Sequence, residues 1–380
     1  MSQKKTSHQQ LITELQTHGL RLTSADQRHV SRRGGAGPSD HQAVTVNDTT
    51  IMVPIYSEST WTSPFSMEST GNGDQIIYEK DDNLIPLTDV SFASEPNFYQ
   101  LKTADGIPYS HLATLHSKDV LATTILQTCI RYESRKKACK FCSIGQSLRA
   151  GRTIAHKTPQ QLAEVAKAAV ELDGVSHMVL TTGTPATSDR GAQVLCESAE
   201  AIKAAVNLPV QGQCEPPADA VWYQRMKDAG IDSLGMHLEV ITPELRKEIM
   251  PGKAEITLEQ YMSAFADAVK VFGRGQVSTY ILAGLGDSVE TLINTGYELI
   301  DIGVYPFVVP FVPIRGTPLE DHTPPTAEFM KSVLAPLGKR LSETGLLAEN
   351  IKAGCGKCGA CSTLSSYENE GSNNESSNVA

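Results

Sequence analysis

The strongest constraint on the fold is an alternation of short apolar runs with stretches of helical period, which fills the middle of the chain. Six apolar runs predict β-strands, at residues 121–127, 177–182, 208–213, 233–238, 276–283 and 304–312. Six helical stretches lie among them, at residues 159–172, 191–206, 218–229, 243–249, 258–272 and 289–302. Strands that alternate with helices build a parallel sheet, so the chain is predicted to have an α/β fold. Six β/α units fit an incomplete barrel as well as a doubly wound sheet.

The region before this alternation, residues 1–118, has a different character. It carries a short amphipathic helical pattern at residues 9–18, a Gly-rich stretch at 34–37, and β-like runs at 43–46 and 50–55. These patterns predict an irregular, partly β lead-in region, which we expect to cover the substrate.

Two further regions follow the alternation, which is assigned to residues 119–322. Residues 323–368 are predicted to form a long helix near 325–343 and then a cysteine-rich segment. Residues 369–380 are rich in Asn, Ser, Glu and Gly, a composition typical of a disordered tail.

Charge and hydropathy limit the partners. The 380 residues carry a net charge of −10 and have a pI near 5.5. Nucleic acids and anionic membranes require a basic surface, so neither is expected as a partner. No apolar run reaches the roughly 18 residues that span a bilayer, and the N-terminus lacks the apolar core of a signal peptide. We therefore expect a cytoplasmic protein that acts on a small molecule.

Six of the eight cysteines fall into two tight groups. A disulfide framework is not expected in the cytoplasm, so tight grouping indicates metal or cluster ligation. The first group, Cys129, Cys139 and Cys142, follows the first predicted strand, at the strand end where barrel active sites are built. Three thiolates can hold a four-iron cluster and leave one iron open. The spacing alone also allows a structural zinc site, which usually has a fourth ligand.

The residues around the last two of these cysteines carry a resemblance. Cys139-Lys140-Phe141-Cys142 resembles the second half of the radical S-adenosylmethionine (SAM) signature, in which an aromatic residue precedes the last cysteine. Nine residues separate the first two cysteines here, where the usual signature has three. The resemblance implies that Cys129, Cys139 and Cys142 hold a [4Fe–4S] cluster and that Phe141 lies beside SAM.

Later strand ends extend the resemblance. The Thr181–Pro185 turn is similar to the Gly-rich turn of the superfamily, which implies that Thr182, Gly183 and Thr184 bind the SAM amino group. Residues 228–239 resemble the fourth-strand region of biotin synthase and lipoyl synthase, which implies that His237 and Glu239 point towards SAM.

Three more segments point the same way. Arg246 and the turn after it resemble lipoyl synthase, and this arginine is predicted to pair with the SAM carboxylate. Residues 282–287 are similar to the fifth-strand Gly motif, which implies that Gly284 packs on adenine. Residues 310–319 resemble the end of the sixth strand in biotin synthase.

Together these segments cover residues 121–322 and imply a partial or complete TIM-like radical SAM barrel with an irregular N-terminal region and a Cys-rich C-terminal extension. The implied cofactors are a [4Fe–4S] cluster and SAM, and the implied partners are a small organic substrate and a one-electron donor such as flavodoxin or ferredoxin. The overall resemblance is greatest to a biotin-synthase-like family found beside nitrilase genes, which suggests nitrile-linked metabolism. A zinc-stabilised barrel that binds a small molecule without catalysis is the alternative from another class. No catalytic acid or base is assigned.

The second cysteine group consists of Cys355, Cys358 and Cys361. One interpretation is a second iron–sulfur cluster that supplies sulfur, relays electrons or anchors the substrate. The other is a structural zinc or cluster site that only pins the C-terminal segment. A fourth ligand would come from Cys196, Cys214 or a serine, since Leu364-Ser365-Ser366-Tyr367 resembles the C-terminal Ser-Ser-Tyr of lipoyl synthase.

For two charged residues near the first group, the sequence allows either a role in the site or a solvated position. Glu215 ends the third strand and is expected either to contact SAM or substrate or to lie solvated in a loop. Arg131 opens a basic run within the cysteine gap, where a solvated loop is the more frequent outcome.

Overall fold

The computed structural model describes residues 7–22, 40–55, 62–71, 73–81, 83–134 and 136–368. The Gly-rich stretch at 34–37 and the predicted tail at 369–380 lie outside these described residues.

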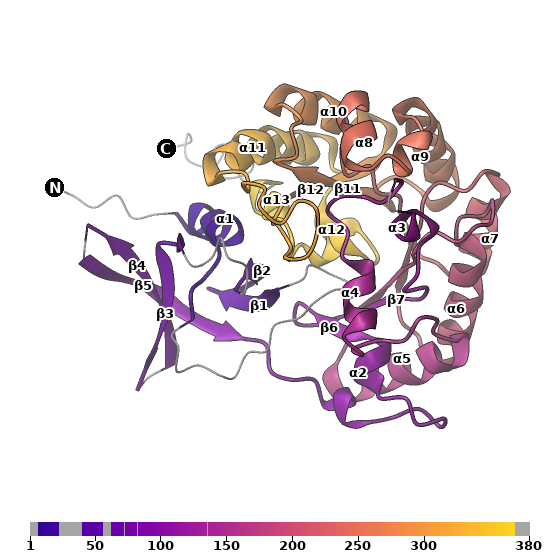
Figure 1. The fold of residues 1–380 in the computed structure, drawn as a ribbon, viewed down its shortest axis with the longest axis horizontal. Helices are drawn as coiled ribbons and strands as arrows, with labels where there is room; N and C mark the ends of the chain where they lie inside the picture. Colours follow the sequence, from indigo (N-terminus) through magenta and orange to yellow (C-terminus); the bar gives the residue numbers. More distant parts are fainter. Residues whose placement is uncertain are drawn as a thin grey trace, which may run out of the picture.

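A seven-stranded sheet forms the centre of the molecule, with strand order β12-β11-β10-β9-β8-β7-β6 (Figure 1). Its strands are β6 Thr114–His116, β7 Val120–Thr124, β8 His177–Thr181, β9 Val210–Gln213, β10 Ser233–Gly235, β11 Val277–Ala283 and β12 Val304–Pro310. The six strands β7 to β12 are parallel, as predicted, and β6 adds an antiparallel edge strand. β6 and β12 lie at opposite ends of this order and do not pair with each other. The curved sheet therefore does not close, and it forms a partial barrel.

Helices cover the convex face of this sheet and short helices follow β7 (Figure 1). The crossover helices are α5 Pro159–Asp173, α6 Ala192–Ala205, α7 Val221–Asp228, α8 Pro243–Ile249, α9 Leu258–Phe272 and α10 Val289–Ile302. The shorter elements are η2 Asn97–Gln100, α2 Tyr109–Leu112, α3 Ile130–Glu133, α4 Ile144–Arg149, η3 Lys253–Glu255 and η4 Ala348–Asn350. Local sequence fixes several starts: Thr158 with Gln161, and Thr257 with Gln260, form capping boxes.

The N-terminal unit is a five-stranded antiparallel sheet with one helix, on the left of Figure 1. It consists of α1 His8–His18, β1 His41–Val46, β2 Thr49–Pro54, β3 Phe65–Thr70, β4 Gly73–Lys80 and β5 Asn83–Phe92. Leu11, Ile12 and Leu15 on one face of α1 pack against buried side chains of the sheet, including Val44 and Ile51. The expected partly β lead-in region is therefore a small sheet with its own apolar core.

The C-terminal segment runs between the N-terminal unit and the concave face of the barrel (yellow in Figure 1). It follows α11 Ala327–Thr344, which packs beside α10, and it contains α12 Cys355–Cys358 and α13 Leu364–Glu368. Ser233 Oγ in β10 donates a hydrogen bond to Ala353 O over 2.6 Å. On the other side, Met52 N and Gln16 Nε2 both donate to Ala360 O, over 2.7 and 2.8 Å. The segment is thus hydrogen-bonded to both units.

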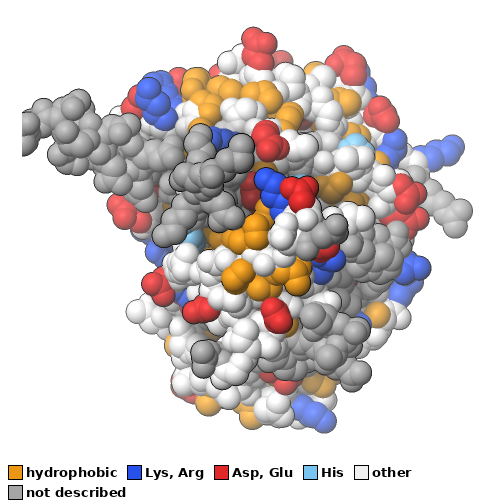
Figure 2. All heavy atoms as spheres, turned by 90° about the vertical axis from the view of Figure 1, so that its left-hand side faces the viewer, with side chains coloured by type: hydrophobic (Ala, Val, Ile, Leu, Met, Phe, Trp, Pro, Cys, Tyr) orange, Lys and Arg blue, Asp and Glu red, His pale blue; other side chains and the backbone are white. Residues whose placement is uncertain are grey.

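The visible surface of the N-terminal side carries Lys and Arg side chains interspersed with Asp and Glu, without a continuous basic field among the described atoms (Figure 2). Within the described ranges, no helix has the length and apolarity needed to cross a bilayer.

The packing of α13 on α11 generates a stability prediction. A Cβ atom at Gly338 in α11 would lie only 2.6 Å from the backbone carbonyl carbon of Tyr367. Alanine ordinarily stabilises a helix by about 1 kcal/mol relative to glycine. We expect Gly338→Ala to lower the free energy of unfolding instead, by about 1–3 kcal/mol, because α13 has to move. Urea unfolding measures the change.

The matched control is Gly296→Ala in α10, where the crowded atom is the end of the flexible Leu337 side chain. Its cost should be smaller than that of Gly338→Ala. A Gly338→Ala chain at least as stable as the unchanged protein would contradict this packing.

Candidate active site and second cysteine site

The first cysteine group lies in the loop that follows β7, at the C-terminal ends of the parallel strands. Cys129 precedes α3, and Cys139 and Cys142 close a tight turn in which Cys142 N donates to Cys139 O over 3.1 Å. All three line a cavity of about 200 Å³. The predicted SAM contacts that also line it are Phe141, Thr182, Gly183, Thr184, His237 and Glu239.

A close backbone contact joins the cysteine loop to the turn after β8. Gly183 N donates to Leu126 O over 2.9 Å, and Ile130 N donates to Thr184 O over 3.0 Å. A Cβ atom at Gly183 would collide with the carbonyl oxygen of Thr128, so only glycine permits this approach. The position of Cys129 is therefore coupled to the Thr182–Thr184 turn.

Glu239 faces the cavity in an unusual backbone conformation. Its φ of +60° lies in the left-handed region, which costs about 1–2 kcal/mol for a residue other than glycine. Bonds to the neighbouring strand hold it there, since Glu239 N donates to Tyr280 O and Leu282 N donates to Glu239 O, each over 2.8 Å. Backbone strain of this kind is typical of functional positions.

The Glu239 carboxylate forms an ion pair with Lys253, a residue that sequence reasoning missed. Lys253 Nζ lies 2.7 Å from Glu239 Oε2, and the two side chains are only 16% and 14% exposed. Burial alone would lower the pKa of Lys253, but the Glu239 carboxylate outweighs it and holds that pKa above its ordinary value. The cavity therefore contains a fixed charge pair beside the cysteines.

His237 presents a neutral ring to the cavity. Its Nδ1 accepts a hydrogen bond from Tyr280 N over 3.2 Å. Burial, followed by the nearby Lys253 charge, lowers the pKa of His237 to about 3. A neutral ring whose Nδ1 accepts carries its proton on Nε2, which makes His237 a hydrogen-bond donor rather than a cation.

The nine-residue cysteine gap is anchored by a buried ion pair between Arg131 and Glu215. Arg131 Nε and Nη2 each lie 2.7 Å from a Glu215 oxygen, and Thr184 Oγ1 donates to the same carboxylate over 2.9 Å. Arg131 Nη1 donates to Gly252 O. Burial would raise the pKa of Glu215, but Arg131 holds it below its usual value. Both side chains are buried, so the solvated-loop interpretation is wrong for each of them. The pair fixes the loop in place and also lines the cavity.

Two predicted SAM contacts do not line the 200 Å³ cavity. Arg246 is only 2% exposed, and its guanidinium donates to Leu238 O, Val240 O and Ile256 O over 2.9, 2.7 and 3.1 Å. These carbonyls take three of its five N–H donors, and the side chain is buried outside the cavity, so the geometry favours a structural role for Arg246 over a carboxylate contact. Gly284 ends the β11 region, where its carbonyl accepts from His322 Nε2 over 2.8 Å.

The second cysteine group lies on the concave face of the same sheet. Gln213 Nε2 in β9 lies 3.2 Å from Cys355 Sγ, and Cys355 N donates to Gln211 Oε1 over 3.2 Å. On its other side, Cys361 Sγ lies 3.4 Å from His116 Nε2. Burial raises the pKa of the Cys355 thiol to about 11. The segment is therefore fixed inside the partial barrel.

Residues of the barrel wall connect the two cysteine groups. Gln213 lines the first cavity and also contacts Cys355. Tyr280 in β11 has its ring centroid 5.6 Å from that of His237, and its hydroxyl interacts with Cys361. The Gln213 and Tyr280 side chains thus lie between the two cysteine groups, an arrangement that sequence spacing alone could not reveal.

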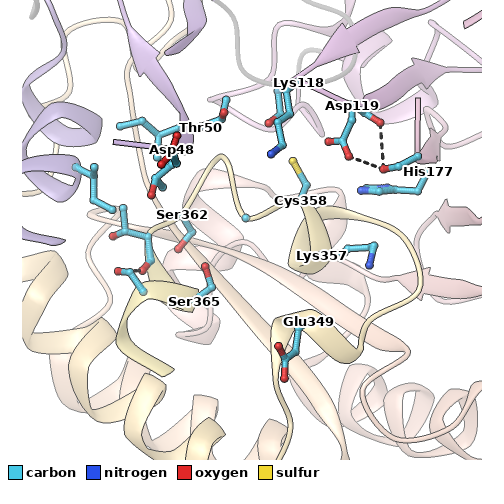
Figure 3. Close-up of a pocket in the computed structure, with 18 residues that line it drawn as sticks. Asp48, Thr50, Lys118, Asp119, His177, Glu349, Lys357, Cys358, Ser362 and Ser365 are labelled. Atoms are coloured by element: carbon cyan, nitrogen blue, oxygen red, sulfur yellow. Dashed lines mark hydrogen bonds between the residues drawn. The ribbon is translucent and has the colours of Figure 1, made fainter. Parts of the chain in front are cut away.

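A second cavity, of about 440 Å³, opens at the opposite ends of the strands and reaches Cys358 (Figure 3). Lys118 and Asp119, just before β7, and His177, at the start of β8, form one side of it. Cys358 is therefore accessible from the side facing away from the first group.

The structure places the three predicted fourth ligands of the second cysteine group, Cys196, Cys214 and a serine, in different parts of the fold. Cys196 lies in α6 and Cys214 is buried at the end of β9, where it contributes to the wall of the first cavity. Ser365 lines the second cavity. Across the described part of the chain, no three or more His, Cys, Asp or Glu side chains are arranged to hold a single metal ion. Each thiolate of a four-iron cluster binds its own iron, so cluster ligands need not converge on one point.

The Arg131–Glu215 pair generates a prediction with an internal control. Glu215→Gln leaves the buried Arg131 charge without its partner, so it should cost about 3–5 kcal/mol of unfolding free energy. Glu255→Gln removes a second carboxylate from the same arginine, but that side chain is 51% exposed, so it should cost under about 1 kcal/mol. Urea unfolding gives both values, and equal effects would contradict a positioning role for Glu215.

Comparison with known proteins places these observations in a family. Residues 136–296 match the model of the radical SAM superfamily. The chain is 25% identical over 249 residues to bacteriochlorophyllide c C-7(1)-hydroxylase of Chlorobaculum limnaeum, covering 60% of this chain and 61% of that protein. It is 28% identical over 171 residues to lipoyl synthase of Marinobacter nauticus, covering 44% of this chain and 47% of that protein.

A third relative is named as an RNA-modifying enzyme. The chain is 25% identical over 125 residues to the probable dual-specificity RNA methyltransferase RlmN of Moorella thermoacetica, covering 33% of this chain and 35% of that protein. The matches thus span less than two thirds of each relative. The superfamily match includes Cys139, Cys142 and strands β8 to β11 of the parallel sheet, and it identifies a radical SAM domain in residues 136–296.

Proposed function

We propose that this protein reductively cleaves SAM at a [4Fe–4S] cluster held by Cys129, Cys139 and Cys142, and abstracts a hydrogen atom from a small organic substrate. The observation that carries the proposal is the convergence of these three thiols with the Thr182–Thr184 turn and Glu239 around one cavity. Each of these features was implied by a separate stretch of sequence.

The donor set of the cavity fits this cluster. Three thiols can ligate three irons and leave the fourth open for the amino and carboxylate groups of SAM. When bound and reduced, the cluster would supply the electron that cleaves SAM to methionine and a 5′-deoxyadenosyl radical. The protein supplies position and electrostatics around it.

The surrounding residues complement the charges of SAM. The Glu239 carboxylate would attract the ammonium and sulfonium groups, and Lys253 Nζ, 2.7 Å from Glu239 Oε2, holds this carboxylate in its orientation. His237 offers a neutral Nε2–H donor, which adds no positive charge beside the sulfonium. The Gly183 turn brings backbone groups close to the cluster loop.

The substrate is proposed to lie in the interior space between the two cysteine groups. Gln213 and Tyr280 connect the first cavity with the second group, so a molecule there would contact both. The acidic charge of −10 favours a small molecule over a nucleic acid, although one relative is named as an RNA methyltransferase. Nitrile-linked metabolism stays a prediction from sequence resemblance, and hydrogen transfer from a nitrile-derived metabolite into 5′-deoxyadenosine would test it.

The proposal predicts a specific pattern of SAM cleavage. After anaerobic reconstitution with iron and sulfide, the protein should form 5′-deoxyadenosine from SAM in the presence of a flavodoxin or ferredoxin reductant. Alanine at Cys129, Cys139 or Cys142 should abolish this activity, because an incomplete thiolate set cannot hold the cluster. Product analysis by chromatography measures it.

Cys196→Ala is the control and should leave cleavage intact, since Cys196 lies in α6 outside the cavity. Cys214→Ala tests a cysteine that lines the cavity but is not proposed as a cluster ligand. This variant should retain iron. Stoichiometric zinc with no SAM cleavage would instead support a non-catalytic zinc-stabilised barrel and overturn the proposal.

Sulfur insertion is the second candidate reaction. It is favoured by Gln213, which lines the cavity of the first group and also contacts Cys355 of the second group. A second iron–sulfur cluster there would hold sulfide within reach of a substrate radical. If this reaction occurs, acid-labile sulfide should fall with each turnover, whereas sulfide that stays constant through several turnovers would reject it.

A further inference from the structure

The edge strand β6 brings a histidine to the second cysteine group. His116 is the last residue of β6, is only 8% exposed, and has its Nε2 3.4 Å from Cys361 Sγ. The next residue, Ser117, has a φ of +58° and interacts through its side chain with the Cys358 thiol. The end of β6 therefore approaches two of the three terminal cysteines.

We propose that His116 Nε2 is the fourth protein ligand of an iron–sulfur cluster held by Cys355, Cys358 and Cys361, and that it shares one iron with Cys361. This inference rests on the second cluster considered above. A thiolate sulfur about 2.3 Å and an imidazole nitrogen about 2.0 Å from one tetrahedral metal lie about 3.5 Å apart. The 3.4 Å separation of Cys361 Sγ and His116 Nε2 matches that geometry.

The remaining two thiols suit a second iron. Cys355 and Cys358 bound the single helical turn α12, and residues three apart in a helix lie on one face. In a [2Fe–2S] cluster each iron takes two protein ligands, and histidine ligands occur on such irons. Cys355 and Cys358 would hold one iron, while Cys361 and His116 hold the other.

Hydrogen-bond donors surround the sulfur ligands. Gln213 Nε2 lies 3.2 Å from Cys355 Sγ, and the Tyr280 hydroxyl interacts with Cys361. Donors to cluster sulfurs stabilise the more reduced state and tune the reduction potential. Both side chains extend from barrel strands that border the proposed substrate position. The reduction potential of the cluster would therefore respond to what is bound there.

Two other side chains near the group serve as alternatives. His177 Nδ1 accepts a hydrogen bond from Gly354 N over 3.2 Å, which fixes this ring by the backbone before Cys355. Ser365 comes from α13 and lies across the second cavity from Lys118 and Asp119. The Cys358 thiol points towards Lys118 and Asp119, away from Ser365 (Figure 3). The geometry assigns the ligand role to His116 rather than to either of them.

The test uses the full chain with Cys129, Cys139 and Cys142 replaced by Ala, so that only the terminal site can bind a cluster. After anaerobic reconstitution, we expect about two irons and two sulfides per chain. Pulsed EPR of the reduced protein should show a strong nitrogen coupling from a histidine ligand. His116→Cys should keep the cluster, lose that coupling and shift the reduction potential to a more negative value, because a thiolate replaces a neutral imidazole.

His177→Ala and Ser365→Ala are the matched controls and should retain the nitrogen coupling. The inference is overturned if the coupling persists in His116→Cys, if it disappears in His177→Ala, or if the terminal site binds zinc or no iron. SAM cleavage is measured separately on the chain with its first cysteine group intact. A failure at His116 is therefore distinguishable from a failure of the proposed activity.

Discussion

The concave face of an open parallel sheet has to be covered, and the rest of this structure depends on how that is done. Helices cover only the convex face, and the concave face carries polar side chains such as Gln211, Gln213 and Ser233 that need partners when buried. The C-terminal segment supplies them, through Ala353 O and the backbone of Cys355. Covering the face therefore carries the terminal cysteines into the barrel.

The same constraint explains the N-terminal unit. The C-terminal segment alone would leave its outer side exposed, and the N-terminal unit binds that side through Met52 N and Gln16 Nε2 to Ala360 O. A unit expected from sequence to cover the substrate thus covers the second cysteine group. The proposed position of the substrate lies between the two cysteine groups.

Much of the barrel could be predicted because its signals are local. The helices at 243–249, 258–272 and 289–302 begin and end where helical periodicity predicted them. The resemblance implied a partial or complete barrel, and the structure shows the partial one. The edge strand β6 and the sheet containing β3 to β5 were not predicted. They depend on pairing between distant segments, and their sequences have weak alternation.

The site shows the same division. Thr182–Thr184, His237 and Glu239 reach one cavity because parallel strand ends meet at one edge, which sequence order alone implies. The resemblance implies that Arg246 contacts SAM, but neighbouring carbonyls take three of its five donors and it lies outside the cavity. The sequence analysis missed three residues that contact the cysteine sites: Lys253, Gln213 and His116. They reach these sites from a turn, from the inner face of a strand and from an edge strand, and no local pattern in the sequence predicts those positions.

The central claim is that one interior space contains an iron cluster at each cysteine group. Anomalous diffraction at the iron edge, from crystals of anaerobically reconstituted protein, tests it most directly. The account predicts two separate iron positions, one at Cys129, Cys139 and Cys142 and the other at Cys355, Cys358 and Cys361. An iron peak missing from either group, or zinc in place of iron there, would contradict it.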